Sequence, residues 1–326
     1  MGRLPSNKSQ IKVDLNHSCG SSLPKVGQNC SFTFSTPVII MAKYNPVPLA
    51  YNSLEPEDWD KDKAPVIFLH GMMGYKEYWN EIPQAVAKAT HRKVYAVDAS
   101  NHGDSPWTDV FNFDVNTDDL LLFMDTIKAP KAILVGHSMG GVTSMQTAIR
   151  VPERIEKIVV EDMTASDLPM QIAVLLKKQF PLIREAIDSI PPELDEVEAR
   201  KFIVDFLAKY IPQPPDSDEK PEYKGIVFPL KRNEDGKYVS KANLDTIQKA
   251  LDDPKNLQSN ISGVYEGPVS FIYGTASHLS ISGDEERIKK HFPNAELVGI
   301  DGASHMVHSD CPLEFLVALL NFLQYE

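Results

Sequence analysis

The fold is most clearly indicated by the stretch Lys131-Ala-Ile-Leu-Val-Gly-His-Ser-Met-Gly-Gly-Val142 and by residues 143–149, which continue it. Its apolar part, Ile133 to Val135, has the length of a buried strand, and the residues after Gly141 have the composition of a helix. Ser138 therefore lies on the turn between them, within the pattern Gly-x-Ser-x-Gly. A serine in an ordinary loop can match this pattern, but a strand before it and a helix after it favour a nucleophile elbow.

The two glycines of the pattern, Gly136 and Gly140, fit the same interpretation. The turn of a nucleophile elbow is so tight that a side chain at either position would collide with the neighbouring strand or helix. Glycine also tolerates strained backbone conformations best. We therefore expect Ser138 to project its hydroxyl group above the sheet as a nucleophile.

Composition narrows the class of protein. The chain has 326 residues, of which 42% are hydrophobic, enough for the core of one large α/β domain with an insertion or of two smaller domains. A net charge of −12 and a pI near 5.3 argue against nucleic acid or an anionic membrane as the main partner and suit a small neutral substrate.

Cysteine usage and hydropathy restrict it further. The three cysteines, Cys19, Cys30 and Cys311, lack the spacing of a zinc site or of a disulfide framework, so neither metal nor thiol chemistry is expected. No run approaches the roughly 18 apolar residues that span a bilayer, and no secretory signal is recognisable. The sequence therefore predicts an intracellular protein without a transmembrane segment.

Residues 1–36 differ from the rest of the chain. They contain seven serines, four basic residues and one acidic residue, Asp14, with little hydrophobic periodicity. This composition is typical of an organellar transit peptide, but a disordered tail without an address has the same features. We interpret residues 1–36 as a leader and leave both alternatives open.

From residue 37 onward, strand and helix patterns alternate. Strands are predicted at 38–43, 47–52, 65–69, 93–97, 133–135, 155–160, 269–273 and 295–300, and helices at 79–90, 115–127, the segment after 141, 283–292 and 312–325. Alternation at this spacing indicates an α/β fold with a doubly wound, mostly parallel sheet and helices on both faces. We assign this core to residues 37–167 and 254–326.

Residues 168–253 interrupt the alternation. They hold helical segments such as 193–210, a turn at 233–236 between short extended pieces, and a proline-rich loop at 212–221. We interpret them as a mainly helical cap inserted after the sixth strand. Open α/β sheets place their sites at the carboxyl ends of the strands, so such a cap would cover Ser138 and shape an apolar pocket.

A nucleophilic serine needs a base, and His305 is the best candidate among nine histidines. It follows a predicted strand and precedes the helix beginning near Pro312, which places it at the same sheet edge as Ser138. The nearby histidines are interpreted as structural or as braces of their loops: His70, His102, His137 and His308. The oxyanion hole would use the backbone N–H groups of Met72 and Met139.

Several motifs together resemble those of the α/β-hydrolase domain-containing protein 11 group and its bacterial esterase relatives. They are His70-Gly-Met-Met-Gly74, Asp98-Ala-Ser-Asn-His-Gly-Asp-Ser-Pro106, Gly136-His-Ser-Met-Gly-Gly141, Asp162-Met-Thr164 and His305-Met-Val-His-Ser-Asp310. The resemblance covers roughly residues 38–326. Ser100 and Ser304 depart from it, since the family has an arginine and a glycine there.

The resemblance implies an α/β-hydrolase fold and a serine hydrolase of acyl esters that needs no cofactor. Its substrate would be a small acyl ester or a lipid, with a glycerolipid such as diacylglycerol as one option. For animal members of the group it implies a mitochondrial address, and the serine-rich leader agrees with that address.

The acid that completes the triad has three candidates. In most α/β hydrolases a carboxylate follows the seventh strand, but the corresponding position here is Ser277, which carries no charge. Asp162, at the end of the sixth strand, is the preferred alternative, with Ser277 as a hydrogen-bonding helper, as the bacterial relatives imply. Asp245 is the third candidate, although it lies on a predicted cap helix.

The predicted chemistry is acyl transfer through a covalent intermediate on Ser138, with His305 as the base and Asp162 as the acid. Two alternatives remain open. The chain could be a catalytically idle α/β-hydrolase fold that serves as a binding or scaffold protein. It could also perform other chemistry on the same fold, such as that of a perhydrolase or a hydroxynitrile lyase.

Overall fold

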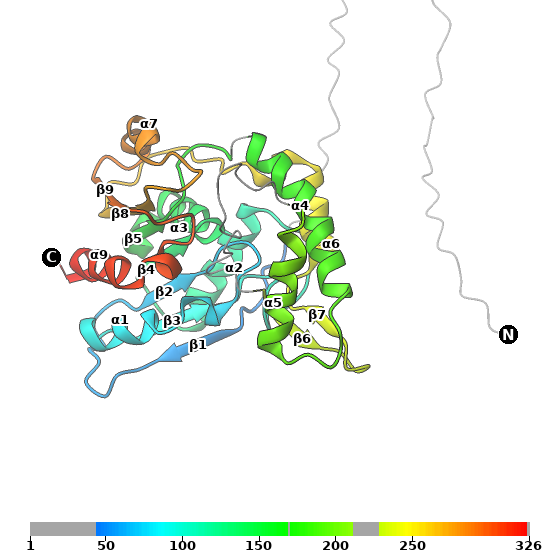
Figure 1. The fold of residues 1–326 in the computed structure, drawn as a ribbon. Coiled ribbons are helices and arrows are strands. Elements are labelled where there is room, and N and C mark those ends of the chain that lie inside the picture. Colours follow the sequence, from blue (N-terminus) through cyan, green and yellow to red (C-terminus); the bar gives the residue numbers. More distant parts are fainter. Residues whose placement is uncertain (1–43, 169, 211–227, 325–326) are drawn as a thin grey trace, which may run out of the picture. The chain divides into compact units, whose positions relative to one another are not determined.

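The computed structural model describes residues 44–168, 170–210 and 228–324 (Figure 1). The predicted leader, the predicted strand 38–43 and the proline-rich loop 212–221 lie outside the described residues. The strands are β1 (Tyr51–Leu54), β2 (Val66–Leu69), β3 (Val94–Val97), β4 (Ala132–His137), β5 (Ile155–Glu161), β6 (Leu230–Arg232), β7 (Tyr238–Ser240), β8 (Val269–Gly274) and β9 (Ala295–Ile300). The α-helices are α1 (Ile82–Thr90), α2 (Phe113–Thr126), α3 (Met139–Arg150), α4 (Met170–Asp188), α5 (Glu196–Leu207), α6 (Leu244–Asp252), α7 (Glu285–His291), α8 (Val307–Asp310) and α9 (Pro312–Gln324). Short 3₁₀ helices occur at η1 (Lys76–Trp79), η2 (Pro152–Arg154), η3 (Pro254–Leu257) and η4 (Ser282–Asp284).

The main sheet has seven strands among the described residues, in the order β1-β3-β2-β4-β5-β8-β9. Strand β1 pairs antiparallel with β3 at one edge, and all other neighbours pair in parallel. The inner strands β2, β3 and β4 are buried along their whole length, as expected for parallel strands covered on both faces. The prediction of a mostly parallel sheet is therefore confirmed.

Helices cover both faces of this sheet (Figure 1). On β4 the side chain of Leu134 joins the hydrophobic cluster under α2 and α3, whereas Ile133 and Val135 join the cluster under α1 and α9. This division follows from the alternation of side chains along a strand. The predicted doubly wound architecture is confirmed.

Several predicted element boundaries differ from the observed ones, and two of the differences have a clear local cause. The strand predicted at 47–52 is observed as Tyr51–Leu54, because the Val47 N–H donates to the Asp119 carboxylate at 2.8 Å instead of to a neighbouring strand. The adjacent Pro46 and Pro48 cannot donate backbone hydrogen bonds. The helix predicted from residue 79 begins only at Ile82, since the positive φ of 51° at Asn80 ends η1 first.

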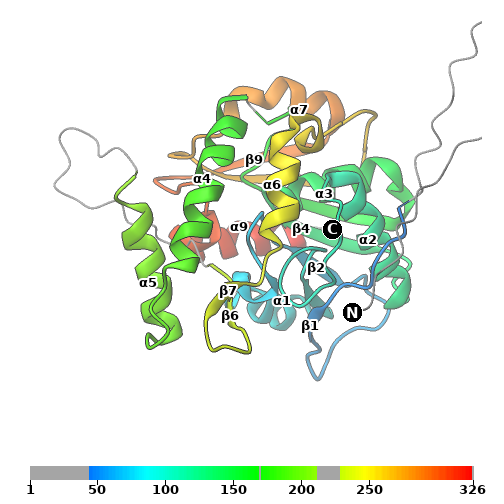
Figure 2. The same ribbon diagram turned by 90° about the vertical axis from the view of Figure 1, so that its right-hand side faces the viewer.

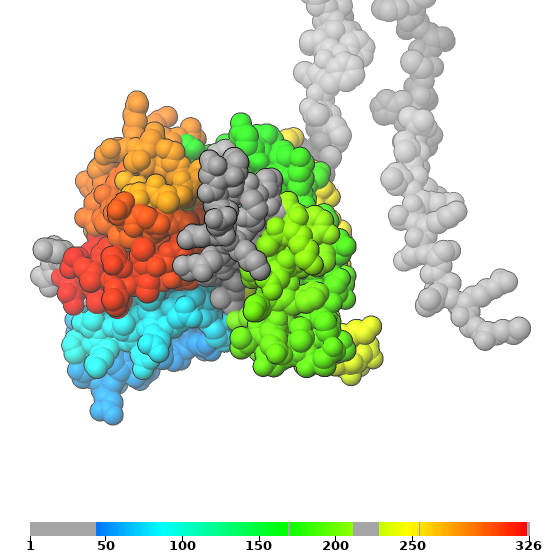
Figure 3. Space-filling view, viewed as in Figure 1, coloured from blue at the N-terminus to red at the C-terminus, as the bar shows by residue number. Residues whose placement is uncertain are grey.

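The chain between β5 and β8 forms α4, α5, the hairpin β6–β7 and α6. The predicted turn at 233–236 is confirmed, because β6 and β7 pair antiparallel and the Asn233 N–H donates to the Lys237 carbonyl at 2.9 Å. This segment follows the fifth described strand instead of the sixth, since the first predicted strand lies outside the described residues. Figure 1 shows α4, α5 and α6 together on the right-hand side, and Figure 2 shows them with that side facing the viewer; in Figure 3 the green and yellow surface of this segment forms a block beside the sheet and its helices.

Polar contacts attach this segment to the loop that follows β3. The Asn243 N–H donates to the Asn101 carbonyl at 2.8 Å, and the Thr246 hydroxyl donates to the Thr108 carbonyl at 3.0 Å. The segment is thus held at a carboxyl end of the parallel sheet, the edge at which sites of open α/β folds lie. Its interpretation as a cap over the site stays a prediction.

Candidate active site

The predicted site residues all follow parallel strands of the main sheet at their carboxyl ends. Met72 follows β2, Ser138 follows β4, Asp162 follows β5, Ser277 follows β8 and His305 follows β9. Because these strands are parallel, their carboxyl ends share one edge of the sheet. The topology therefore gathers residues that are far apart in the sequence.

Ser138 lies between β4 and α3 in a strained conformation with φ 50° and ψ −110°. A positive φ is uncommon for a residue with a side chain and persists only where the surroundings enforce it. Here the Ser138 N–H donates to the Glu161 carbonyl, and the Val142 N–H donates to the Ser138 carbonyl, both at 3.0 Å. These bonds fix the turn between the strand and the helix.

The glycines on either side of Ser138 are required by close backbone contacts. A Cβ atom at Gly136 would lie 2.2 Å from the Gly140 carbonyl oxygen, and one at Gly140 would lie 2.1 Å from the Leu69 carbonyl oxygen. Neither neighbour can yield, because each is a backbone atom. The collisions predicted from the sequence are confirmed.

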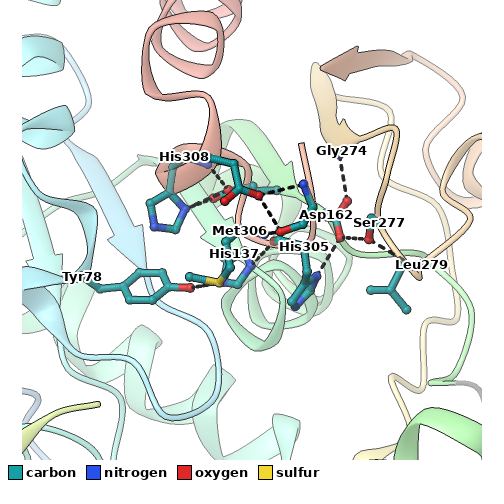
Figure 4. A network of polar contacts seen from close by, with 12 residues as sticks. Tyr78, His137, Asp162, Gly274, Ser277, Leu279, His305, Met306 and His308 are labelled. Atoms are coloured by element: carbon teal, nitrogen blue, oxygen red, sulfur yellow. Dashed lines mark hydrogen bonds and ion pairs between the residues drawn. The ribbon is translucent and has the colours of Figure 1, made fainter. Parts of the chain in front are cut away.

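Asp162 and His305 form the central pair of the site (Figure 4). The His305 Nδ1 lies 2.7 Å from Asp162 Oδ2; the carboxylate is fully buried, and the imidazole side chain is 37% exposed. Asp162 also accepts a hydrogen bond from the Gly274 N–H at 3.0 Å and one from the Ser277 hydroxyl at 2.5 Å. When Nδ1 donates to a carboxylate, a neutral imidazole carries its lone pair on Nε2, so His305 can accept a proton there.

The three candidates for the acid occupy different surroundings. Asp162 contacts His305 directly, and the Ser277 hydroxyl donates to the same carboxylate oxygen, Asp162 Oδ2. Asp245, in the first turn of α6, instead pairs with Arg184 of α4 at 2.7 Å, and its side chain is 76% exposed. The structure therefore does not bring Asp245 to His305.

The loop after β2 packs against the serine turn. A Cβ atom at Gly71 would lie 2.5 Å from His137 Nδ1 and 3.4 Å from the Ser138 Cβ, so only glycine permits this approach. Met72 comes next, and Met139 contributes the first N–H of α3. Neither the Met72 nor the Met139 N–H has an acceptor within the described part of the chain. Both amides are thus free to bind an anionic oxygen.

Two buried histidines brace the loops around the site. The His70 ring bonds the Gly71 carbonyl through Nδ1 at 2.7 Å and accepts the Ala99 N–H on Nε2 at 3.0 Å. The His102 Nε2 accepts the Met73 N–H at 3.3 Å. Burial lowers the pKa of His70 to about 4 and that of His102 to about 3. Both rings are therefore neutral braces, in agreement with their predicted structural role.

His137 holds the backbone of His305. Its Nε2 donates to the His305 carbonyl at 2.9 Å, and its Nδ1 lies 3.1 Å from the Tyr78 hydroxyl. Burial lowers the pKa of His137 to about 3. His137 is thus a neutral link between β4 and the loop that carries His305.

Glu161 is a residue of the site for which the sequence predicted no role. Its carboxylate is fully buried and lies 2.8 Å from the Nδ1 of His308, which is also fully buried. The signal in the sequence was a glutamate at the end of a predicted buried strand, next to Asp162. Acidic residues are almost never fully buried unless they are paired.

The site has the components of nucleophilic catalysis in an open arrangement. Among the described residues, the Ser138 hydroxyl and the His305 ring are not hydrogen-bonded to each other. Such bonds are often long without substrate and tighten only in the complex.

The described residues contain no group of three or more His, Cys, Asp or Glu side chains that could hold a metal ion. None of their helices is long and apolar enough to cross a membrane.

Comparisons with known proteins agree with this geometry. The model of the alpha/beta hydrolase fold family matches residues 64–312. The sn-1-specific diacylglycerol lipase ABHD11 of Danio rerio is 31% identical over 87% of this chain and 85% of its own length. The mouse protein of the same name is 31% identical over 86% of this chain and 87% of its own.

Among solved structures, a marine microorganism esterase superposes with a TM-score of 0.69 at 29% sequence identity, covering 85% of this chain and 99% of the esterase. The described fold and the curated relatives therefore agree. This chain belongs to the α/β-hydrolase family, in the group of the ABHD11 relatives.

Proposed function

We propose that this hydrolase is a serine esterase or lipase that cleaves carboxylic acyl esters through an acyl-enzyme intermediate on Ser138. The observation that carries the proposal is the hydrogen bond between the buried Asp162 carboxylate and the partly exposed His305 ring, at the sheet edge that also holds the Ser138 turn. The free amides of Met72 and Met139 support it, because they face no competing acceptor among the described residues. Packing alone would not require these features together.

In the proposed reaction, His305 Nε2 takes the proton of Ser138 as Oγ attacks the ester carbonyl carbon. The Met72 and Met139 amides donate hydrogen bonds to the oxyanion, and Asp162 stabilises the imidazolium. The intermediate then collapses, the ester C–O bond breaks, and His305 protonates the departing alcohol. Water, deprotonated by His305, next attacks the acyl-enzyme and releases the carboxylic acid and Ser138.

For the substrate we propose a neutral lipid ester, with diacylglycerol as the first candidate. The two relatives above carry the name of diacylglycerol lipase, and a neutral substrate is compatible with a net charge of −12. Lipid metabolism would then be the setting of the activity. A mitochondrial address would fit the composition of residues 1–36, which lie outside the described residues.

The direct test is Ser138→Ala. We expect it to abolish ester hydrolysis and covalent labelling by a fluorophosphonate while the circular dichroism spectrum and the melting temperature stay near those of the wild type. The matched control is Ser189→Ala, which removes an exposed serine hydroxyl at the end of α4 and should change neither readout. A panel of esters graded by chain length, with diacylglycerol included, would identify the preferred substrate.

Three outcomes would contradict the proposal. Labelling of the folded Ser138→Ala variant at another residue would mean a different nucleophile. A folded wild-type protein that neither reacts with the probe nor hydrolyses any ester would support the idle scaffold. Hydrogen-peroxide-dependent peracid formation or cyanohydrin cleavage in place of hydrolysis would support a perhydrolase or a hydroxynitrile lyase.

A further inference from the structure

A second carboxylate–histidine pair, Glu161–His308, is formed by the residue before Asp162 and the residue three positions after His305. Glu161 ends β5, and His308 lies in the short helix α8. The His308 Nδ1 is 2.8 Å from Glu161 Oε1 and 3.0 Å from Oε2, and the His308 backbone N–H donates to Oε1 at 2.8 Å. One carboxylate therefore holds both the ring and the backbone of the same residue.

Glu161 contacts each of the three segments that carry the proposed catalytic residues. Its backbone carbonyl accepts the Ser138 N–H at 3.0 Å, and Asp162 is the next residue along the chain. Its carboxylate binds His308, which lies three residues after His305. A substitution at Glu161 would therefore reach the segments of the nucleophile, the acid and the base together.

We propose that Glu161 is a positioning residue that, through His308, keeps His305 oriented between Asp162 and Ser138. This inference rests on the proposed function, because it assigns Glu161 a part in the esterase reaction. His137 anchors the other end of the same segment, since its Nε2 donates to the His305 carbonyl at 2.9 Å. The segment from His305 to His308 is thus tied at both ends to the edge of the sheet.

Burial makes the pair costly as a mere packing element. Glu161 and His308 are both fully buried, and the His308 ring is surrounded by Tyr78, Trp79 and Phe315, with ring centroids 4.6, 4.8 and 6.2 Å away. Apolar residues of similar volume often stabilise such a place as well as or better than a buried ionic pair does. A fixed geometry of the neighbouring segment is what the pair adds.

The surroundings keep Glu161 ionised. Burial by itself would raise the pKa of Glu161, but the attraction of His308 and the hydrogen bonds from its ring and its backbone outweigh burial and hold this pKa below its usual value. A carboxylate accepts the hydrogen bonds of His308 without donating a proton of its own. Loss of the charge should therefore loosen the bond to the histidine ring before it loosens the fold.

The first experiment is Glu161→Gln, measured as kcat and KM on an ester and as the rate of fluorophosphonate labelling. We expect kcat and the labelling rate to fall by about 10- to 100-fold, because a misplacement of about 1 Å in an active site can cost that much. KM should stay unchanged, since Glu161 is buried and does not line the surface that substrate reaches. The matched control is His291→Gln. His291 lies in α7, and its largely buried ring bonds the Gly263 carbonyl; loss of this bond should leave kcat at the wild-type value.

The second variant separates positioning from stability. In Glu161→Leu/His308→Phe both side chains become apolar. The midpoint of urea unfolding should therefore rise from its value in Glu161→Gln toward the wild-type value, while kcat stays low. Recovery of kcat together with the midpoint would overturn the inference, because the pair would then act through stability alone. A folded Glu161→Gln variant with wild-type kcat and labelling rate would overturn it as well. A folded wild-type protein without labelling or hydrolysis would instead refute the esterase proposal, and the inference would fall with it.

Discussion

The two carboxylate–histidine pairs of this protein have nearly the same geometry and different surroundings. The Nδ1–oxygen distance is 2.7 Å in Asp162–His305 and 2.8 Å in Glu161–His308. The His305 side chain is 37% exposed, whereas His308 is fully buried with its Nε2 unpartnered. The two pairs thus differ in the exposure of the histidine ring to solvent and not in the bond to the carboxylate. His305 can exchange a proton with a substrate, whereas the role of the buried His308 is structural.

Two consecutive residues, the last residue of β5 and the first one after it, supply the two acids. Glu161 still belongs to β5, but Asp162 has a positive φ of 44°, which ends the strand. The two carboxylates therefore diverge, that of Glu161 toward α8 and that of Asp162 toward Gly274 and Ser277. A single backbone turn assigns the neighbouring acids to different histidines.

The largest loss of activity is expected for a substitution in the Asp162–His305 pair. Asp162→Asn should lower turnover by about 10⁴-fold with little change in substrate binding, because the acid fixes the imidazole tautomer and stabilises the imidazolium. The measurement is kcat and KM on the best ester of the panel. Asp245→Asn is the control and should be nearly silent, since Asp245 pairs with Arg184 on the surface. A severe loss in Asp245→Asn beside a mild one in Asp162→Asn would reverse the proposed assignment.

Parts of the fold and of the site that depend on short-range patterns could be predicted from the sequence. The serine turn was predictable because Gly136 and Gly140 lie within a few residues of Ser138 and face backbone atoms. The parallel sheet followed from the alternation of apolar runs and amphipathic segments. The position of His305 followed from the rule that sites lie at the carboxyl ends of parallel strands.

Features that depend on long-range contacts could not be predicted in the same way. The bond between Glu161 and His308 joins residues 147 positions apart, and neither residue has a local pattern that announces the other. The sequence left open which of Asp162, Ser277 and Asp245 completes the triad, because only the three-dimensional structure shows which carboxylate points to His305. The strand predicted at 47–52 was misplaced because the Asp119 side chain accepts the hydrogen bond of the Val47 N–H.

The second prediction extends the comparison to the buried histidines that lack a carboxylate partner. Burial lowers the pKa of His70, His102 and His137 to between about 3 and about 4, from an ordinary value of 6.5. Below pH 6.5 the unfolded chain binds protons that the folded chain does not, so the free energy of unfolding falls as the pH falls. Their stabilising contribution is complete above the ordinary pKa, and each histidine loses at most about 1.4 kcal/mol per pH unit below it.

Urea unfolding at neutral pH and at about pH 5 measures this dependence. His102→Gln keeps an acceptor for the Met73 N–H but cannot be protonated, so the free energy of unfolding should fall less steeply with acid than in the wild type. The exposed His278→Gln serves as the control and should leave the slope unchanged. An unchanged slope in His102→Gln would mean that His102 is protonated in the folded state as readily as in the unfolded one.

The smallest loss of activity is expected for a substitution of Ser277, which contacts Asp162. Its hydroxyl donates to Asp162 at 2.5 Å, and Ser277→Ala removes this donor while His305 and the Gly274 N–H continue to hold the carboxylate. A hydrogen bond of this kind contributes about 0.5 to 1.5 kcal/mol, so kcat should fall about tenfold or less. Measured beside Asp162→Asn, the ratio of the two losses states how much of the acid's effect is its charge and how much is its orientation. A loss in Ser277→Ala as large as that in Asp162→Asn would show that the hydroxyl, and not the carboxylate alone, sets the orientation of His305.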